Sequence, residues 1–288
     1  MVSTYFYRTL QKIFKQNSNE SAYLDAQPNN RSDPPWLKKD IIEKYTDQLE
    51  STNGPVVYKN GEVLEYKANM ELLIQHKIPC VIITKFDALK FVNFIPNGLG
   101  CYYGYGYVLT ALHVVKPPRF GKSKILIAFP TEDFILVYKA DFNQSCNTDA
   151  DRDLAFVKLR GNTHPLGDGL HNQIANMNVN DNIYFHTRAL NGNFQKQEGE
   201  VYKKMTKPDM FAISVAGKPG DSGSPIFNSK HELVAIYRGG FQNSEFGHCS
   251  KIPQNFTPWV QSLRLSSYFL HKWQLFLCFL SKIGDEPL

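Results

Sequence analysis

The stretch Gly220-Asp221-Ser222-Gly223-Ser224-Pro225 decides how the rest of this 288-residue chain is interpreted. Glycine, aspartate, serine and proline all favour tight turns, so the stretch could be an ordinary loop. Its glycines also allow the backbone to expose N–H groups beside the serine hydroxyl. A hydroxyl becomes a useful nucleophile only next to a base and to donors that receive an oxyanion. Ser222 is therefore a candidate nucleophile if the chain also supplies a base.

The candidate base is His113, in the stretch Thr110-Ala111-Leu112-His113-Val114-Val115. It follows the apolar run 107–110, which predicts a strand, so the ring would project from a rigid element of the fold. A single histidine beside an apolar strand is more often structural than catalytic. However, none of the other histidines has a comparable Thr-x-x-His setting after a glycine-rich pair of strands. These are His76, His164, His171, His186, His231, His248 and His271.

A carboxylate that orients the imidazole would complete a triad, and Asp153 is the best candidate. It is the first residue of the apolar run 153–159, which predicts a strand, so the carboxylate would be held at the start of that strand. Its rivals Asp149 and Asp151 lie in a polar loop, where carboxylates need no function. We expect the neighbouring Arg152 to face solvent rather than to pair with Asp153.

These motifs and their order resemble the chymotrypsin-clan serine peptidases, the trypsin-like family. Thr110-Ala111-Leu112-His113 is similar to the Thr-Ala-Ala-His of that family, and Asp153-Leu154-Ala155-Phe156 to its Asp-Ile-Ala-Leu. The serine hexapeptide matches Gly-Asp-Ser-Gly-x-Pro outright. The resemblance extends roughly from Cys80 to Arg264, and its short spacings are closest to compact HtrA/Deg-like members. Unlike full-length members of that branch, this chain is expected to have no PDZ domain.

The resemblance implies further residues of the site. The backbone N–H groups of Gly220 and Ser222 would form the oxyanion hole. The substrate pocket would include Ala216, Tyr237 and Gly239. No acid occupies position 216, so a preference for basic residues is not supported, and Tyr237 either lines the pocket or only packs in its strand.

Activation is expected to differ from that of trypsin-like zymogens. Asp221 is present, but no Ile-Val-Gly-Gly terminus precedes the domain to pair with it. A constitutive or partner-controlled site is therefore expected.

The expected fold class is mainly β. From Cys80 onward about a dozen short apolar runs follow one another without helical patterns between them, and 101–110 reads as one continuous run. The number of runs fits a sandwich as well as a barrel. The resemblance implies two six-stranded β-barrels of chymotrypsin-like type, with a C-terminal helix over 257–264.

Three regions are expected along the chain. Residues 1–75 form a small mixed N-terminal extension, with a linker over 17–35, a helix that starts at Asp33-Pro34, and a hairpin around Asn60-Gly61. Residues 76–265 form the peptidase domain. Residues 266–288 are an apolar C-terminal tail that is too short and too polar to span a bilayer comfortably.

Composition excludes several classes of function. The net charge of +5 is mild and dispersed, so no nucleic-acid partner is expected. No metal or organic cofactor is expected either. The cysteines are odd in number and widely spaced, which indicates free thiols in a reducing compartment. They are Cys80, Cys101, Cys146, Cys249 and Cys278.

The expected location is intracellular. The cytoplasm is favoured, a mitochondrial location is the alternative, and secretion is disfavoured because residues 1–16 contain no long apolar core.

The sequence predicts a serine endopeptidase that acts on proteins or peptides. The alternative is a catalytically inactive or latent binding protein on a protease fold. An esterase is a third interpretation, but the chain order His-Asp-Ser and the missing Gly-x-Ser-x-Gly elbow disfavour the α/β-hydrolase type.

Overall fold

The computed structural model describes residues 33–52, 54–68, 70, 74–86, 94–116, 123–142, 148–189, 192–207, 209–240 and 244–253. All of these residues belong to one compact unit. The expected linker before residue 33, the helix over 257–264, the apolar tail, Cys146 and Cys278 lie outside the described residues.

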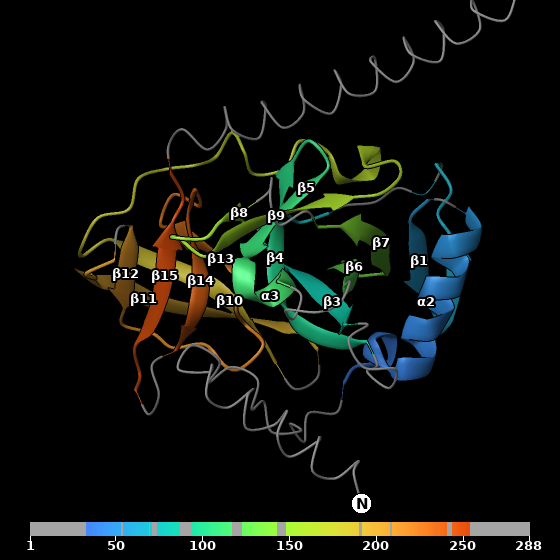
Figure 1. The fold of residues 1–288 in the computed structure, drawn as a ribbon, viewed down its shortest axis with the longest axis horizontal. Coiled ribbons are helices and arrows are strands. Elements are labelled where there is room, and N and C mark those ends of the chain that lie inside the picture. Colours follow the sequence, from blue (N-terminus) through green and yellow to red (C-terminus); the bar gives the residue numbers. More distant parts are fainter. Residues whose placement is uncertain are drawn as a thin grey trace, which may run out of the picture. The chain divides into compact units, whose positions relative to one another are not determined.

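The first barrel is closed by six antiparallel strands in the order β7-β6-β3-β4-β5-β9, and β9 returns to pair with β7 (Figure 1). Its members are β3 (Cys80–Phe86), β4 (Ile95–Gly104), β5 (Tyr107–Ala111), β6 (Ser123–Pro130), β7 (Ile135–Asp141) and β9 (Leu154–Leu159). The short strand β8 (Thr148–Asp149) extends the sheet beside β9. A single turn of helix, α3 (Leu112–Val115), follows β5 directly and carries His113.

The second barrel is closed in the order β10-β11-β12-β15-β14-β13. Its members are β10 (Asn182–Arg188), β11 (Phe194–Lys204), β12 (Met210–Ile213), β13 (Pro225–Asn228), β14 (Leu233–Gly240) and β15 (Gly247–Lys251). The 3₁₀ turn η2 (His164–Leu166) lies in the connection between the barrels. The two six-stranded barrels expected from the resemblance are therefore confirmed, and the sandwich is excluded.

The strand boundaries differ from the expectation at two places. The run 101–110 is two strands, β4 and β5, because Tyr105 and Gly106 take positive φ angles of 56° and 80° and turn the chain back. Strand β15 was not expected at all. Its residues are Gly, His, Cys, Ser and Lys, and they form no apolar run, although Cys249 and Ser250 are fully buried.

The N-terminal part of the described chain packs on the first barrel. Helix α2 (Lys39–Thr52) buries Ile41, Ile42, Tyr45 and Leu49 on one face, in a cluster that also holds core residues of β3, β6 and β7. The hairpin of β1 (Val56–Lys59) and β2 (Glu62–Glu65) joins the sheet through β7. Asn60 and Gly61 make the connecting turn with positive φ angles, as an Asn-Gly hairpin turn requires.

The helix begins later than the Asp33-Pro34 start that the sequence favoured. Pro34 is extended, with ψ 158°, because the proline that follows it disfavours the helical region. The chain instead forms the 3₁₀ turn η1 (Pro35–Leu37), and α2 starts at Lys39.

Among the described residues, no helix combines the length and the apolar character that crossing a bilayer requires.

The packing of α2 predicts a large effect of truncating its buried face. Ile42 is 2% exposed, so Ile42→Ala should lower the free energy of unfolding by about 2–5 kcal/mol, which urea denaturation measures. The matched control Lys44→Ala, on the exposed face, should stay within about 0.5 kcal/mol of wild type. Equal effects of the two substitutions would mean that the helix does not depend on this packing.

Candidate active site

Asp153 binds His113 through both its side chain and its backbone. The ring Nδ1 of His113 lies 2.7 Å from Asp153 Oδ2, and the backbone N–H of His113 donates to Oδ1 at 3.0 Å. The backbone N–H of Leu112 also donates to the carbonyl of Asp153 at 2.8 Å. Because an ionised carboxylate only accepts, the ring proton of His113 is placed on Nδ1, which leaves Nε2 as the basic nitrogen.

The local backbone explains how Asp153 reaches this position. Asp153 has a φ of 54°, a left-handed conformation that aspartate tolerates better than most residues. It stands immediately before β9, which pairs with β5 so that Leu154 lies opposite Ala111. Strand β5, which ends two residues before His113, and strand β9, which starts after Asp153, are therefore direct neighbours.

Arg238 is a third partner of Asp153, and it comes from the second barrel. Its Nε donates to Asp153 Oδ2 at 2.9 Å, and its Nη1 lies 2.8 Å from the sulfur of Met210. Only 17% of the Arg238 side chain and 10% of the Asp153 side chain are exposed, so this ion pair is largely shielded from water. His113 and Arg238 thus share one carboxylate oxygen.

Two titratable groups are shifted by this cluster of charges. Burial raises the pKa of Asp153, but the hydrogen bonds and positive charges of His113 and Arg238 outweigh burial, so this pKa lies below its usual value. The pKa of His248, on β15, is lowered to about 4 by burial and by the positive charges of Arg238 and His113. We therefore expect Asp153 to be ionised and His248 neutral near pH 7.

Ser222 is nearly buried, with 8% of its surface exposed, and its hydroxyl donates to the backbone carbonyl of Arg238 at 2.8 Å. The segment around it is fixed to both barrels. Leu99 of β4 donates its backbone N–H to the carbonyl of Ser222, and the N–H of Gly223 donates to the carbonyl of Tyr237 on β14, each at 2.8 Å. Arg238 therefore contacts both Ser222 and Asp153, the first through its carbonyl and the second through its side chain.

The loop before Ser222 is held by Asp221, which is fully buried. Its two carboxylate oxygens accept hydrogen bonds from the backbone N–H of Arg188 at 3.0 Å and of Lys218 at 2.6 Å. Two backbone donors, one at the end of β10 and one in the loop itself, therefore hold this carboxylate. Among the described residues, none accepts a hydrogen bond from the N–H groups of Gly220 or Ser222.

The residues expected to line a substrate pocket lie beside this loop. Tyr237 is fully buried on β14, and its ring stacks on Phe185 with 4.7 Å between centroids. Ala216 belongs to the loop before Ser222, and Gly239 lies opposite His248 of β15.

Arg152 does not simply face solvent, contrary to the expectation. Its guanidinium pairs with Asp149 at 2.7 Å and with Asp209 at 2.6 Å. Asp209 lies between β11 and β12, so this ion pair joins the Asp153 loop to the second barrel. No local pattern indicates this contact, because Arg152 and Asp209 are 57 residues apart.

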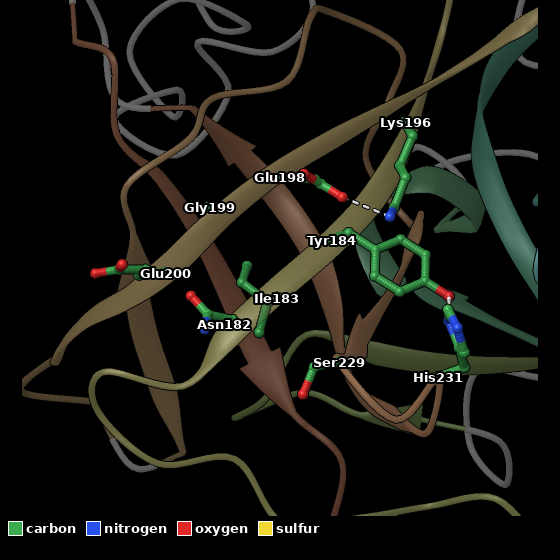
Figure 2. Close-up of a pocket in the computed structure, with 9 residues that line it drawn as sticks. All are labelled: Asn182, Ile183, Tyr184, Lys196, Glu198, Gly199, Glu200, Ser229 and His231. Atoms are coloured by element: carbon green, nitrogen blue, oxygen red, sulfur yellow. Dashed lines mark hydrogen bonds and ion pairs between the residues drawn. The ribbon is translucent and has the colours of Figure 1, made fainter.

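Two hollows of the described surface lie away from these residues. One lies on β10 and β11, where Lys196 pairs with Glu198 and the hydroxyl of Tyr184 meets Nδ1 of His231 at 2.7 Å (Figure 2). The other is lined by Tyr105, Asp168 and His171, among others. The described residues contain no group of three His, Cys, Asp or Glu placed to hold a metal ion.

Sequence reasoning overlooked Arg238 and His248. Alternation along β14 could have found Arg238, because the buried Tyr237 points into the second barrel and its neighbour must point to the opposite face. His248 gave no signal, because the polar strand that carries it was not recognised.

Comparison with known families agrees with the motifs. Residues 98–236 match the family model described as a trypsin-like peptidase domain. This segment of the chain is therefore a trypsin-like peptidase domain. Comparison with curated proteins gives no match.

Several solved structures are similar at low identity. The protease domain of MamO from Magnetospirillum magneticum (apo form) is 18% identical, with a TM-score of 0.47, and the match covers 64% of this chain and 96% of that one. A serine endoprotease from Yersinia pestis is 16% identical, with a TM-score of 0.45 and coverages of 68% and 62%. The HtrA-type protease AlgW with decapeptide is 14% identical, with a TM-score of 0.48 and coverages of 66% and 65%. Similarities this weak do not bear on function.

Gly223 is predicted to be indispensable for the position of Ser222. A Cβ there would stand 1.9 Å from the carbonyl oxygen of Leu99 and 2.3 Å from Oγ1 of Thr110, and the φ of 92° disfavours any side chain. Gly223→Ala should therefore lower the free energy of unfolding by more than about 3 kcal/mol in urea denaturation. Gly167→Ala is the control, because its φ is also positive but nothing lies within 4 Å, and it should cost only about 1 kcal/mol. Similar losses in the two variants would contradict the contact with Leu99.

Removing Arg238 should make stability more sensitive to acid. A carboxyl whose native pKa is lowered stabilises the fold above its unfolded pKa of about 3.9 and loses this contribution as the pH falls through the native value. Arg238→Met removes one cause of the lowering, so the pKa of Asp153 should rise and stability should be lost at a higher pH than in wild type.

Urea unfolding at about pH 7 and about pH 4.5 measures this change. Arg160→Met is the control, since Arg160 pairs with Asp141 in an exposed ion pair. If both variants follow the wild-type pH dependence, Arg238 does not hold the charge of Asp153.

Proposed function

We propose that the protein is a serine endopeptidase in which Ser222 is the nucleophile, His113 the general base and Asp153 the group that orients it. One observation carries the proposal. The Asp153 carboxylate accepts both the ring N–H and the backbone N–H of His113, which fixes the tautomer that a general base needs. The same carboxylate also binds the side chain of Arg238, whose carbonyl accepts the Ser222 hydroxyl, so Arg238 links the carboxylate to the serine.

The reaction starts when the Ser222 hydroxyl turns from the carbonyl of Arg238 toward Nε2 of His113. As its oxygen attacks the peptide carbonyl, its proton moves to Nε2, and the backbone N–H groups of Gly220 and Ser222 receive the oxyanion. His113 then protonates the leaving amine, the C–N bond breaks, and an ester of Ser222 remains. Water then loses a proton to His113 and attacks this ester. The bond between the acyl carbon and the Ser222 oxygen breaks, His113 returns the proton to that oxygen, and the acid is released.

Arg238 acts in this scheme through Asp153. Its guanidinium keeps the carboxylate ionised in a site that is largely shielded from water, so the carboxylate can stabilise the imidazolium that forms at His113. The same positive charge also repels that imidazolium. Arg238 therefore acts on the rate in two opposite ways: it keeps Asp153 ionised, and it repels the imidazolium of His113.

A latent binding protein on the same fold is the second candidate. The observation that favours it is the hydrogen bond from the Ser222 hydroxyl to the carbonyl of Arg238. While this bond is made, the hydroxyl proton is not donated to His113. The peptidase requires only rotation about one side-chain bond to leave this position. Latency requires that the hydroxyl stays there.

A fluorophosphonate probe should label wild type and should not label Ser222→Ala, because only an activated serine reacts. Cleavage of an unfolded protein substrate should fall by at least about a thousandfold in the same variant. Intact-protein mass and gel-based cleavage measure the two effects.

Ser229→Ala is the matched control, because Ser229 is an exposed turn residue of the same barrel. It should behave as wild type in both assays. Folded wild type that is neither labelled nor active would favour the latent binding protein, whereas cleavage of activated esters without proteolysis would favour an esterase.

A further inference from the structure

We infer that the ring of Tyr237 fills the primary side-chain pocket of the site, so that the enzyme cleaves after glycine or alanine and not after large residues. This inference rests on the proposed function and names the substrate class of the same site. Tyr237 was expected either to line a pocket or only to pack in its strand. Its position supports a different role, in which it occupies the pocket.

Tyr237 lies directly beside the nucleophile. The N–H of Gly223 donates to its carbonyl, and its own N–H donates to the carbonyl of Ser224 at 2.9 Å. A peptide carbonyl that reaches Ser222, with its oxygen at the N–H groups of Gly220 and Ser222, must place the adjoining side chain close to this segment. The neighbours of the Tyr237 ring come from the loop before Ser222, from β14 and from the start of β15.

Three of these neighbours are glycines, and the Tyr237 ring lies among them. A Cβ on Gly217 would stand 2.9 Å from Cε1 of the ring, and a Cβ on Gly247 would stand 2.8 Å from Cε2. A Cβ on Gly240 would stand 3.7 Å from the hydroxyl. These glycines come from the loop, from β15 and from β14, and the ring borders all three. The carbonyl oxygen of Val215 also borders Gly247, and Cβ of Ala216 also borders Gly240, so the ring fills most of the slot that the missing side chains leave.

The ring is also fixed in the slot. Its hydroxyl accepts a hydrogen bond from the backbone N–H of Gly217 at 2.7 Å, and its face stacks on Phe185 with an interplanar angle of 14°. None of its surface is exposed. A large substrate side chain would have to displace the ring, which breaks this hydrogen bond and the stacking, whereas a hydrogen atom or a methyl group needs no displacement.

The test uses peptidyl diphenyl phosphonates that differ only in the residue at the reacting end, alanine or phenylalanine, and measures their rates of labelling Ser222. Wild type should react at least about tenfold faster with the alanine probe, because pockets discriminate by about this factor for each misfitting group. Tyr237→Val opens the slot and should favour the phenylalanine probe. Tyr237→Phe keeps the ring and removes only the hydroxyl, so it should keep the preference for alanine.

Equal labelling of wild type by both probes would overturn the inference. So would the same change of preference in Tyr237→Phe and Tyr237→Val. Circular dichroism shows whether Tyr237→Val is folded, and if it is not, the preference of wild type and of Tyr237→Phe decides the question.

A small fluorophosphonate without a side chain separates the inference from the proposed function, because its reaction reports only on the reactivity of Ser222. If it labels nothing, the proposed function fails, and the slot is then tested in the Ser222→Ala background. There, N-acetyl-phenylalanine amide should stabilise Tyr237→Gly against heat and leave the protein with Tyr237 unchanged. Stabilisation of neither protein, or of both, would overturn the inference.

Discussion

The carboxylate of Asp153 is the constraint on which the rest of the site depends. A buried charge is costly unless hydrogen bonds and an opposite charge compensate it, and this one receives two donors from His113 and a third from Arg238. His113 belongs to the first barrel and Arg238 to the second. The same interaction that orients the imidazole therefore also fixes the two barrels relative to each other at the site. Arg152, which pairs with Asp209, adds a second ion pair across the same boundary.

The serine loop is stabilised by a separate set of contacts. Asp221 accepts two backbone N–H groups, and the main chain of Ser222 and Gly223 is bonded to β4 and β14. These partners are main-chain groups of strands and of the loop itself, so the pairing of the strands in the barrels sets their positions. The imidazole and the loop thus have separate sets of contacts. Arg238 links the two sets, because its guanidinium contacts Asp153 and its carbonyl accepts the Ser222 hydroxyl.

The sequence was informative where chemistry or turn geometry restricts the residue type. The histidine and aspartate motifs led to two residues that contact each other, His113 and Asp153, and the pair Asn60-Gly61 identified its hairpin. Features that depend on contacts between residues far apart in the chain could not be predicted from the sequence. Nothing near Arg238 indicates that Asp153, 85 residues away, is its partner. Strand β15 is held by pairing with β12 and β14 and not by an apolar pattern, so its residues did not read as a strand.

In the proposed reaction Ser222 becomes acylated during turnover. The most direct measurement is to mix the protein with an alanine p-nitrophenyl ester, quench it with acid within seconds, and locate the added mass by peptide mapping. We expect one acyl group on Ser222 in wild type, and a much smaller amount in His113→Ala, whose base is missing. A turnover signal without any adduct on Ser222, or an equal adduct in His113→Ala, would contradict it.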